Sequence, residues 1–125
     1  MSQRILEGIK VLDLTNVLSG PFTTLHLALL GAEVIKVENP RDRELARKLG
    51  ILPELNKRLM GTSFIAQNCN KKSITLNTKS AEGKAILLRM AKDADVVVEN
   101  FRPGVMDRLG LGYKALAEIN PGLVY

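Results

Sequence analysis

The stretch Val96-Val97-Val98-Glu99-Asn100-Phe101-Arg102-Pro103-Gly104 decides the fold class of this chain. Its three consecutive β-branched residues predict a strand buried on both faces, as strands of parallel sheets are. The strand then changes into an acid, an amide, an aromatic ring and a cation before a Pro-Gly turn. Open α/β sheets form ligand sites where strands end in this way. The alternative is an ordinary strand-to-turn junction, so the interpretation depends on whether the pattern recurs.

Two earlier segments repeat the pattern. Residues 9–14 alternate apolar and polar side chains and residues 33–38 do the same, so both are predicted strands with polar carboxyl ends. The polar groups at the three strand ends are Asp13, Thr15, Asn16, Lys36, Glu38, Asn39, Glu99, Asn100 and Arg102. In a parallel sheet these groups would converge on one crevice. Lys36 and Glu38 have a second interpretation, in which they simply pair with each other.

Helices are expected between the strands. Pro21 suits the first turn of a helix over 21–30, and Gly31 is typical of the residue that ends one. A second helix is expected over 80–93, with Ser80 as its N-cap. Shorter elements are predicted at 44–49, 54–60, 106–109 and 114–119 (helices) and at 73–76, 95–99 and 122–125 (strands). This order predicts an α/β fold: a Rossmann-like, doubly wound parallel sheet with helices on both faces. Residues 41–61 carry no chemistry beyond that of a surface or a lid.

Composition narrows the class of ligand. The 125 residues suffice for one domain or part of one, and 46% hydrophobic with 25% charged residues is typical of a globular protein. A net charge of +5 favours anionic partners. Aromatic residues make up 4%, which argues against a nucleic-acid stacking surface and leaves a phosphorylated ligand. Neither Gly-x-Gly-x-x-Gly nor a P-loop motif follows the first strand, which disfavours a NAD enzyme or a P-loop NTPase.

Cysteine and histidine usage indicates the compartment and argues against a metal centre. One cysteine, Cys69, cannot form an intrachain disulfide, which favours a reducing cytoplasm. With His26 as the only histidine, too few soft ligands remain for zinc. Cys69 is interpreted as a small buried thiol and His26 as an imidazole on a helix surface. The chain shows neither a secretory signal nor an apolar run long enough to span a membrane.

Five blocks of sequence carry a family resemblance: Ser19-Gly20-Pro21 with Leu30 to Glu38, Asn68 to Ser73, Val98 to Gly104, Leu109 to Tyr113, and Asn120-Pro121. In this order they resemble the amino-terminal part of class III coenzyme A (CoA) transferases, the family of formyl-CoA transferase, carnitine CoA-transferase and the α-methylacyl-CoA racemases. The resemblance covers essentially the whole chain. Residues 1–125 are therefore expected to form an incomplete, CoA-binding, Rossmann-like segment that ends before the catalytic region.

The resemblance implies a set of residues that hold the nucleotide end of CoA. They are Val17, Leu18, Ser19, Asn39, Leu76, Asn77, Thr78, Lys79, Asn100, Phe101, Arg102 and Arg108. Phe101 would cover the adenine ring, and the arginines would bind phosphate oxygens. Composition alone favours a place in the core for Val17 and Leu76 over ligand contact, and favours a solvated helix charge for Arg108. The chain departs from common family residues at Lys72, Asn77 and Asn39.

The implied activity is that of an acyl-CoA:carboxylate CoA-transferase, with acyl-CoA and a carboxylic acid as substrates and no metal. The alternatives are an α-methylacyl-CoA racemase or a truncated, non-catalytic nucleotide-binding module. The family's nucleophilic aspartate would follow Tyr125, and Asp13, Asp93, Asp95 and Asp107 do not match it, so this chain is expected to hold no catalytic residue. The full-length form would be an interlocked homodimer without nucleic-acid or membrane partners.

Overall fold

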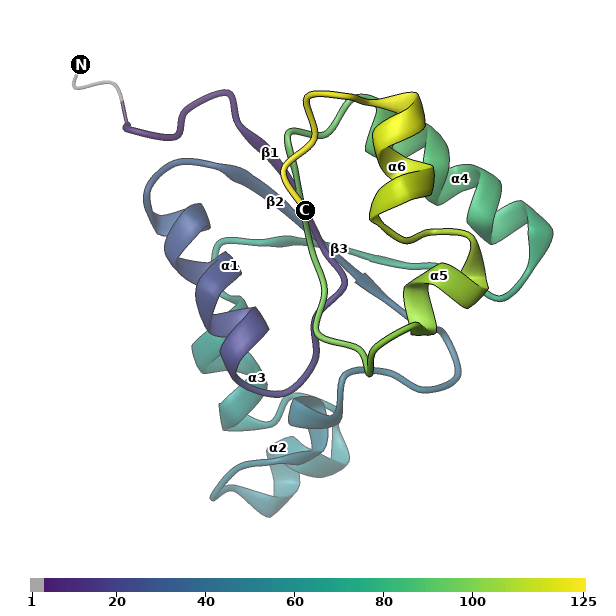
Figure 1. Ribbon diagram of the computed structural model, residues 1–125. Helices are drawn as coiled ribbons and strands as arrows, with labels where there is room; N and C mark the ends of the chain where they lie inside the picture. The colour runs from purple at the N-terminus through teal and green to yellow at the C-terminus, as the bar shows by residue number, and fades with distance from the viewer. Residues whose placement is uncertain (1–3) are drawn as a thin grey trace.

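The computed structural model describes residues 4–125, which form a four-stranded parallel sheet flanked by helices on both faces (Figure 1). Its strands are β1 (Lys10–Asp13), β2 (Glu33–Glu38), β3 (Lys72–Thr75) and β4 (Val96–Val98). They lie in the order β3-β2-β1-β4, and every neighbouring pair is parallel. The α/β class and the Rossmann-like sheet predicted from the alternation of elements are confirmed.

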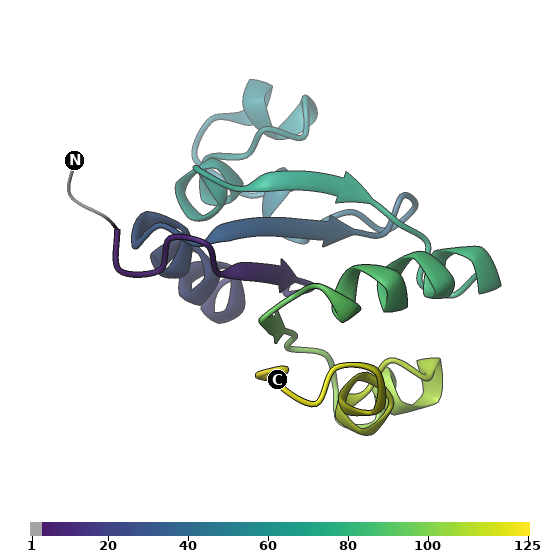
Figure 2. The same cartoon turned by 90° about the horizontal axis from the view of Figure 1, so that it is seen from above.

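Helices connect the strands and cover the sheet on two sides (Figure 2). They are α1 (Ser19–Leu29), the 3-10 turn η1 (Leu45–Lys48), α2 (Pro53–Lys57), α3 (Thr62–Asn68), α4 (Ala81–Lys92), α5 (Val105–Leu109) and α6 (Tyr113–Ile119). The predicted caps are present: the Ser80 hydroxyl accepts a hydrogen bond from the N–H of Gly83 at 3.0 Å. Gly31 follows α1 at a φ of +110°, a conformation that glycine tolerates best.

The core has two parts because successive residues of a strand point to opposite faces. On the α4 side Leu12, Leu14, Val37 and Val97 pack with side chains such as Leu87. The smaller cluster on the α1 side contains Val11, Ala28, Ala32 and Val34, with Val96 and Val98 packed against it. The two sides of the sheet therefore differ in how much apolar surface they bury.

Several expectations need correction. Of the three valines in β4 only Val97 is buried, because Val96 and Val98 are half-buried on the α1 side. Residues 122–125 contribute a single parallel bridge, Val96 to Val124, rather than a strand. Helix α3 was not predicted, and Cys69 at its end is exposed rather than buried. His26 does lie on the exposed surface of α1.

Within residues 4–125, no helix combines the length and the apolar character that crossing a membrane requires. The same residues contain no group of three His, Cys, Asp or Glu side chains arranged to hold a metal ion.

Candidate functional site

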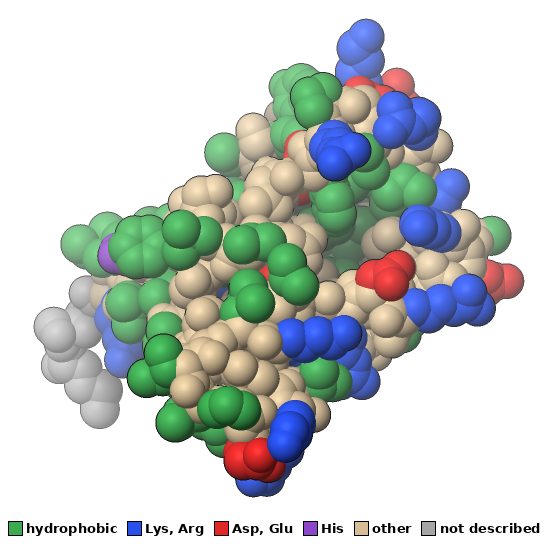
Figure 3. All heavy atoms as spheres, turned by 90° about the horizontal axis from the view of Figure 1, so that it is seen from below, with side chains coloured by type: hydrophobic (Ala, Val, Ile, Leu, Met, Phe, Trp, Pro, Cys, Tyr) green, Lys and Arg blue, Asp and Glu red, His purple; other side chains and the backbone are tan. Residues whose placement is uncertain are grey.

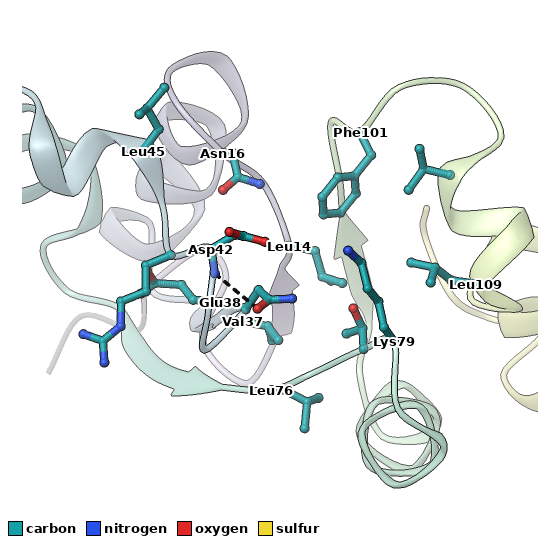
Figure 4. A pocket seen from close by; sticks show the side chains of 14 residues that line it. Leu14, Asn16, Val37, Glu38, Asp42, Leu45, Leu76, Lys79, Phe101 and Leu109 are labelled. Carbon is teal, nitrogen blue, oxygen red and sulfur yellow. Dashed lines mark hydrogen bonds between the residues drawn. The ribbon is translucent and has the colours of Figure 1, made fainter.

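A cleft of about 410 Å³ opens at the carboxyl edge of the sheet (Figure 4). One wall comes from the ends of β1 and β2, and Phe101 and Leu109 lie on the opposite side (Figure 4). The full lining comprises Leu14, Asn16, Val37, Glu38, Asn39, Asp42, Arg43, Leu45, Leu76, Thr78, Lys79, Phe101, Val105 and Leu109. Its lining is mostly apolar and also carries the acids Glu38 and Asp42 and the cations Arg43 and Lys79. Apolar walls with a few polar groups suit a flat apolar ring that carries polar substituents. Figure 3 views the molecule from below, where a hollow opens among lysine and arginine side chains.

A second, more open hollow of about 470 Å³ adjoins the first. Its walls are residues 16–19, which connect β1 to α1, and residues 100–102, which follow β4. Asn16 and Phe101 line both hollows, so the two share a boundary. The amino end of α1 contributes Ser19 to the second hollow. The structure thus brings the ends of β1, β2 and β4 together at one edge, as the sequence predicted.

Most residues implied by the family resemblance line one of these hollows. The first contains Asn39, Leu76, Thr78, Lys79 and Phe101. The second contains Val17, Leu18, Ser19, Asn100 and Arg102, again with Phe101. The interpretation of Val17 as core is wrong, because its side chain is 43% exposed, whereas Leu76 both lines the cleft and belongs to the core. Ligand contact by these residues stays a prediction.

Two implied residues line neither hollow. The Asn77 side-chain oxygen accepts the N–H of Lys79 at 3.1 Å, and its carbonyl accepts the N–H of Ser80 at 3.1 Å. Asn77 therefore shapes the turn that leads into α4. Arg108 is exposed on α5, and a Cβ added to Gly104 would lie 3.2 Å from its Nη1 atom. Its placement agrees with that of a solvated helix charge.

The side chain of Asn100 forms two hydrogen bonds with the main chain of Asn16. Its Oδ1 accepts the N–H of Asn16 at 2.9 Å, and its Nδ2 donates to the carbonyl of Asn16 at 2.8 Å. This reciprocal pair joins the loop after β4 to the loop after β1. Glu99 shapes the same turn, because its Oε2 accepts the N–H of Phe101 at 2.7 Å.

Buried charges lie beneath the two hollows, on the α1 side of the sheet. Asp13 is fully buried and accepts hydrogen bonds from the hydroxyls of Thr15 and Thr24. Lys71 donates to its Oδ2 at 3.0 Å. Burial alone would raise the pKa of Asp13, but Lys36, the two hydroxyls and Lys71 together hold it below its ordinary value. Burial lowers the pKa of Lys71, and the carboxylate of Asp13 opposes that change.

The neighbouring charges on β2 pair with the segment that follows it. Lys36 Nζ lies 3.0 Å from Glu44 Oε2, and both side chains are buried. The Arg47 guanidinium contacts Glu38 at 2.6 and 2.7 Å. Burial would raise the pKa of Glu38, but its bonds with Arg47 and with the Glu44 N–H keep it below its ordinary value. Lys36 and Glu38 therefore do not pair with each other, and that interpretation is wrong.

The segment 41–61 contributes more than a surface or a lid. Asp42, Arg43 and Leu45 line the cleft, and Glu44 is buried beneath it. A local signal exists only for Glu44, which is an acid directly before a short helical turn and accepts the N–H of Ala46 at 3.3 Å. Its partners Lys36 and Val17 lie far away in sequence, so no local pattern identifies them.

A family model and the sequences of known proteins both relate this chain to CoA-transferases. The family model described as "CoA-transferase family III" matches residues 6–125. A formyl-CoA:oxalate CoA-transferase from Streptomyces coelicolor is 48% identical over 125 residues, covering 100% of this chain and 30% of the relative. An acyl-CoA transferase from Fusarium pseudograminearum is 49% identical over 129 residues, covering 99% of this chain and 28% of the relative.

Solved structures show the same relationship. A CAIB/BAIF family protein from Brucella suis superposes with a TM-score of 0.86 at 37% identity, covering 99% of this chain and 33% of that protein. The hypothetical protein Rv3272 from Mycobacterium tuberculosis gives a TM-score of 0.86 at 42% identity, covering 98% of this chain and 32% of its own. The chain spans about 30% of the length of the curated relatives it matches. The chain belongs to CoA-transferase family III.

Proposed function

We propose that this chain supplies the CoA-binding part of an acyl-CoA:carboxylate CoA-transferase, which moves CoA from an acyl thioester to a carboxylic acid. The observation that carries the proposal is the pair of adjoining hollows at the carboxyl edge of the sheet, with Phe101 between them. They lie where open α/β sheets bind nucleotides. Relatives named as CoA-transferases favour this function over a racemase.

The chemistry of the hollows fits the base and the phosphates at the nucleotide end of CoA. The first has apolar walls for a base, with both acids (Glu38 and Asp42) and cations (Arg43 and Lys79) at its polar positions. The second has Arg102 and the amino end of α1, where free N–H groups favour phosphate. Phe101 offers a ring face to an adenine on either side. We therefore keep the implied residues that line the hollows as CoA contacts, except Asn100, whose polar atoms bond the main chain of Asn16, and drop direct contact for Asn77 and Arg108.

Transfer requires a nucleophile, and Asp13 is unsuited to that role. Its carboxylate is fully buried and both oxygens have partners: Oδ1 accepts from Thr15, and Oδ2 from Thr24 and Lys71. A carboxylate enclosed in this way cannot reach a thioester carbon. We therefore propose that Asp13 serves the fold, and that the chain on its own binds CoA without turning it over.

We also propose that the whole protein forms an interlocked homodimer and is located in the cytoplasm. An interlocked homodimer of the whole protein would give the exposed apolar side chains on α1, such as Phe22 and Leu29, a surface to contact. The single cysteine supports a reducing compartment such as the cytoplasm.

Isothermal titration calorimetry of the chain with CoA and with inorganic phosphate tests the binding proposal. We expect CoA to bind measurably and phosphate to bind far more weakly. Phe101→Ala should weaken CoA binding about tenfold, because stacking of a base on an aromatic ring contributes roughly 1–3 kcal/mol. Phe22→Ala is the matched control, since Phe22 is also an exposed ring but lines neither hollow. Equal affinity for CoA and phosphate would contradict the proposal.

A further inference from the structure

The loop that connects β1 to α1 is held by side chains from three other places in the fold. At Thr15, the N–H donates to Asp13 Oδ1 at 3.0 Å and the carbonyl accepts from Lys36 Nζ at 2.8 Å. At Asn16, both main-chain groups bond to the side chain of Asn100. At Val17, the N–H donates to Glu44 Oε1 at 2.7 Å. Three successive residues thus have their main-chain N–H groups bonded to side-chain oxygens.

This arrangement supports a backbone conformation that valine disfavours. Val17 has a φ of +72°, in the left-handed region where a β-branched side chain is strained. Such a conformation persists only where surrounding interactions impose it, and it is found most often at functional sites. The bonds from Asn100 to Asn16 and from Glu44 to Val17 act on the strained residue and on its neighbour.

The held conformation determines what the second hollow presents. The side chains of Val17 and Leu18 are 43% and 60% exposed, and both line that hollow. Without the bonds, Val17 would relax toward negative φ and these two side chains would move. The polar atoms of Asn100 already have main-chain partners, so its side chain shapes the hollow through the loop.

We propose that Asn100 and Glu44 are positioning residues that hold residues 15–17 in the conformation required to bind CoA, with Asn100 acting through Asn16 rather than by touching the ligand. The proposal rests on the CoA-binding function proposed above. It assigns Asn100 a role different from the direct contact that the family resemblance implies. It also gives Glu44 a role in a segment where the sequence indicated none.

Asn100→Ala tests the proposal with two measurements on the chain. The first is amide hydrogen exchange of Asn16 and Val17, measured by NMR without ligand, and the second is CoA affinity by calorimetry. Asn100 is exposed, so its truncation leaves the core intact. Asn120→Ala is the matched control, because the Asn120 Nδ2 likewise bonds two main-chain carbonyls, of Ala91 and Ala94, far from the hollows.

In Asn100→Ala we expect the Asn16 and Val17 amides to exchange at least tenfold faster and CoA to bind about tenfold more weakly. Asn100→Asp keeps the oxygen that accepts from Asn16, so it should restore part of both. Glu44→Gln has one oxygen for both the Val17 N–H and the buried Lys36 ammonium, so it should lose part of the Val17 protection and some stability. Asn120→Ala should leave both the loop amides and CoA affinity as in the unchanged chain.

Two results would overturn the proposal. One is weaker CoA binding by Asn100→Ala with the loop amides as protected as before, which would mean direct ligand contact. The other is loss of loop protection with CoA affinity unchanged, which would mean that the held conformation does not matter for binding. Failure of the CoA-binding function itself would appear in the unchanged chain, which would then not bind CoA, and would overturn both proposals.

Discussion

The two faces of the sheet are built from the same strands but differ in chemistry. Residues facing α4, such as Leu12, Leu14 and Val37, stay apolar to the carboxyl ends of the strands, after charged residues at the exposed amino ends. Residues facing α1 change along the two central strands, from Val11 to Asp13 in β1 and from Val34 to Lys36 in β2. On the α1 face, the amino half is therefore a small apolar core and the carboxyl half is a buried ionic network.

This difference shows where stability and function are separated in the molecule. An apolar face needs only to exclude water, and it can do so with any well-packed side chains. Buried charges gain little net stability, because removing them from water costs about as much as their attraction returns. Here they lie beneath the candidate site and hold the Thr15 carbonyl and the Val17 N–H through Lys36 and Glu44. The buried charges therefore serve mainly to position this loop and contribute less to the stability of the fold.

The largest effect on stability is expected from Asp13→Ala, which disrupts the buried ionic network on the α1 face. The change leaves Lys36 and Lys71 buried with less compensation, and removing one partner of a buried ion pair costs about 3–5 kcal/mol. Urea unfolding followed by circular dichroism should show this loss in the free energy of unfolding. Glu54→Ala removes an acid from an exposed pair with Lys57 and should change stability by less than about 0.5 kcal/mol. Equal effects of the two changes would mean that burial does not distinguish the network.

A somewhat smaller effect is expected from Leu87→Ala on the apolar face. Leu87 is 1% exposed, and truncating a buried leucine costs about 3 kcal/mol because it leaves a cavity. We expect the folded variant to bind CoA as tightly as the unchanged chain, since Leu87 lines neither hollow. Ile86→Ala on the same helix is the control and should cost far less, because Ile86 is 36% exposed. Loss of CoA affinity in Leu87→Ala would contradict the separation of the two faces.

The smallest effect is the dependence of stability on pH, which also comes from the ionic half. The folded-state pKa values of Asp13 and Glu38 lie below their ordinary values, so the unfolded chain takes up more protons once the pH falls below about 4.5. The stability they contribute is present above that pH and is lost as the pH falls through their folded-state pKa values. Urea midpoints at pH 7, 5, 4 and 3 should stay level and then drop. Because buried pairs are screened little, 0.5 M salt should leave the drop in place. A midpoint unchanged down to pH 3 would refute the prediction.

Elements with strong local signals were predictable from sequence. The alternation in 33–38, the Ser80 cap and the Gly31 stop correspond to real boundaries in the structure. Helix α3 gave no such signal, since it has seven residues, no side-chain cap and no buried residue. Its place depends on tertiary contacts, such as the Arg47 guanidinium 3.7 Å from the centre of the Phe64 ring.

The candidate site was predictable in location but not in its internal contacts. Polar residues at three strand ends indicated the edge, and most of them lie there. The pairing of Asn100 with Asn16 spans 84 positions, and Glu44 reaches Val17 across 27. Neither pairing leaves a periodic pattern, because it depends on the order of strands in the sheet. The sequence also overestimates the burial of β4. This strand lies at the edge of the sheet, and its burial depends on neighbouring segments rather than on its own residues.

The position of Phe101 in both hollows couples the shapes of the two hollows. The ring lines both hollows, together with Asn16, so a change in its rotamer alters the shape of both at once. A molecule bound in one hollow restricts the Phe101 ring and thereby changes the wall of the other hollow. Substitutions at this position therefore change both hollows together and cannot tune one of them alone.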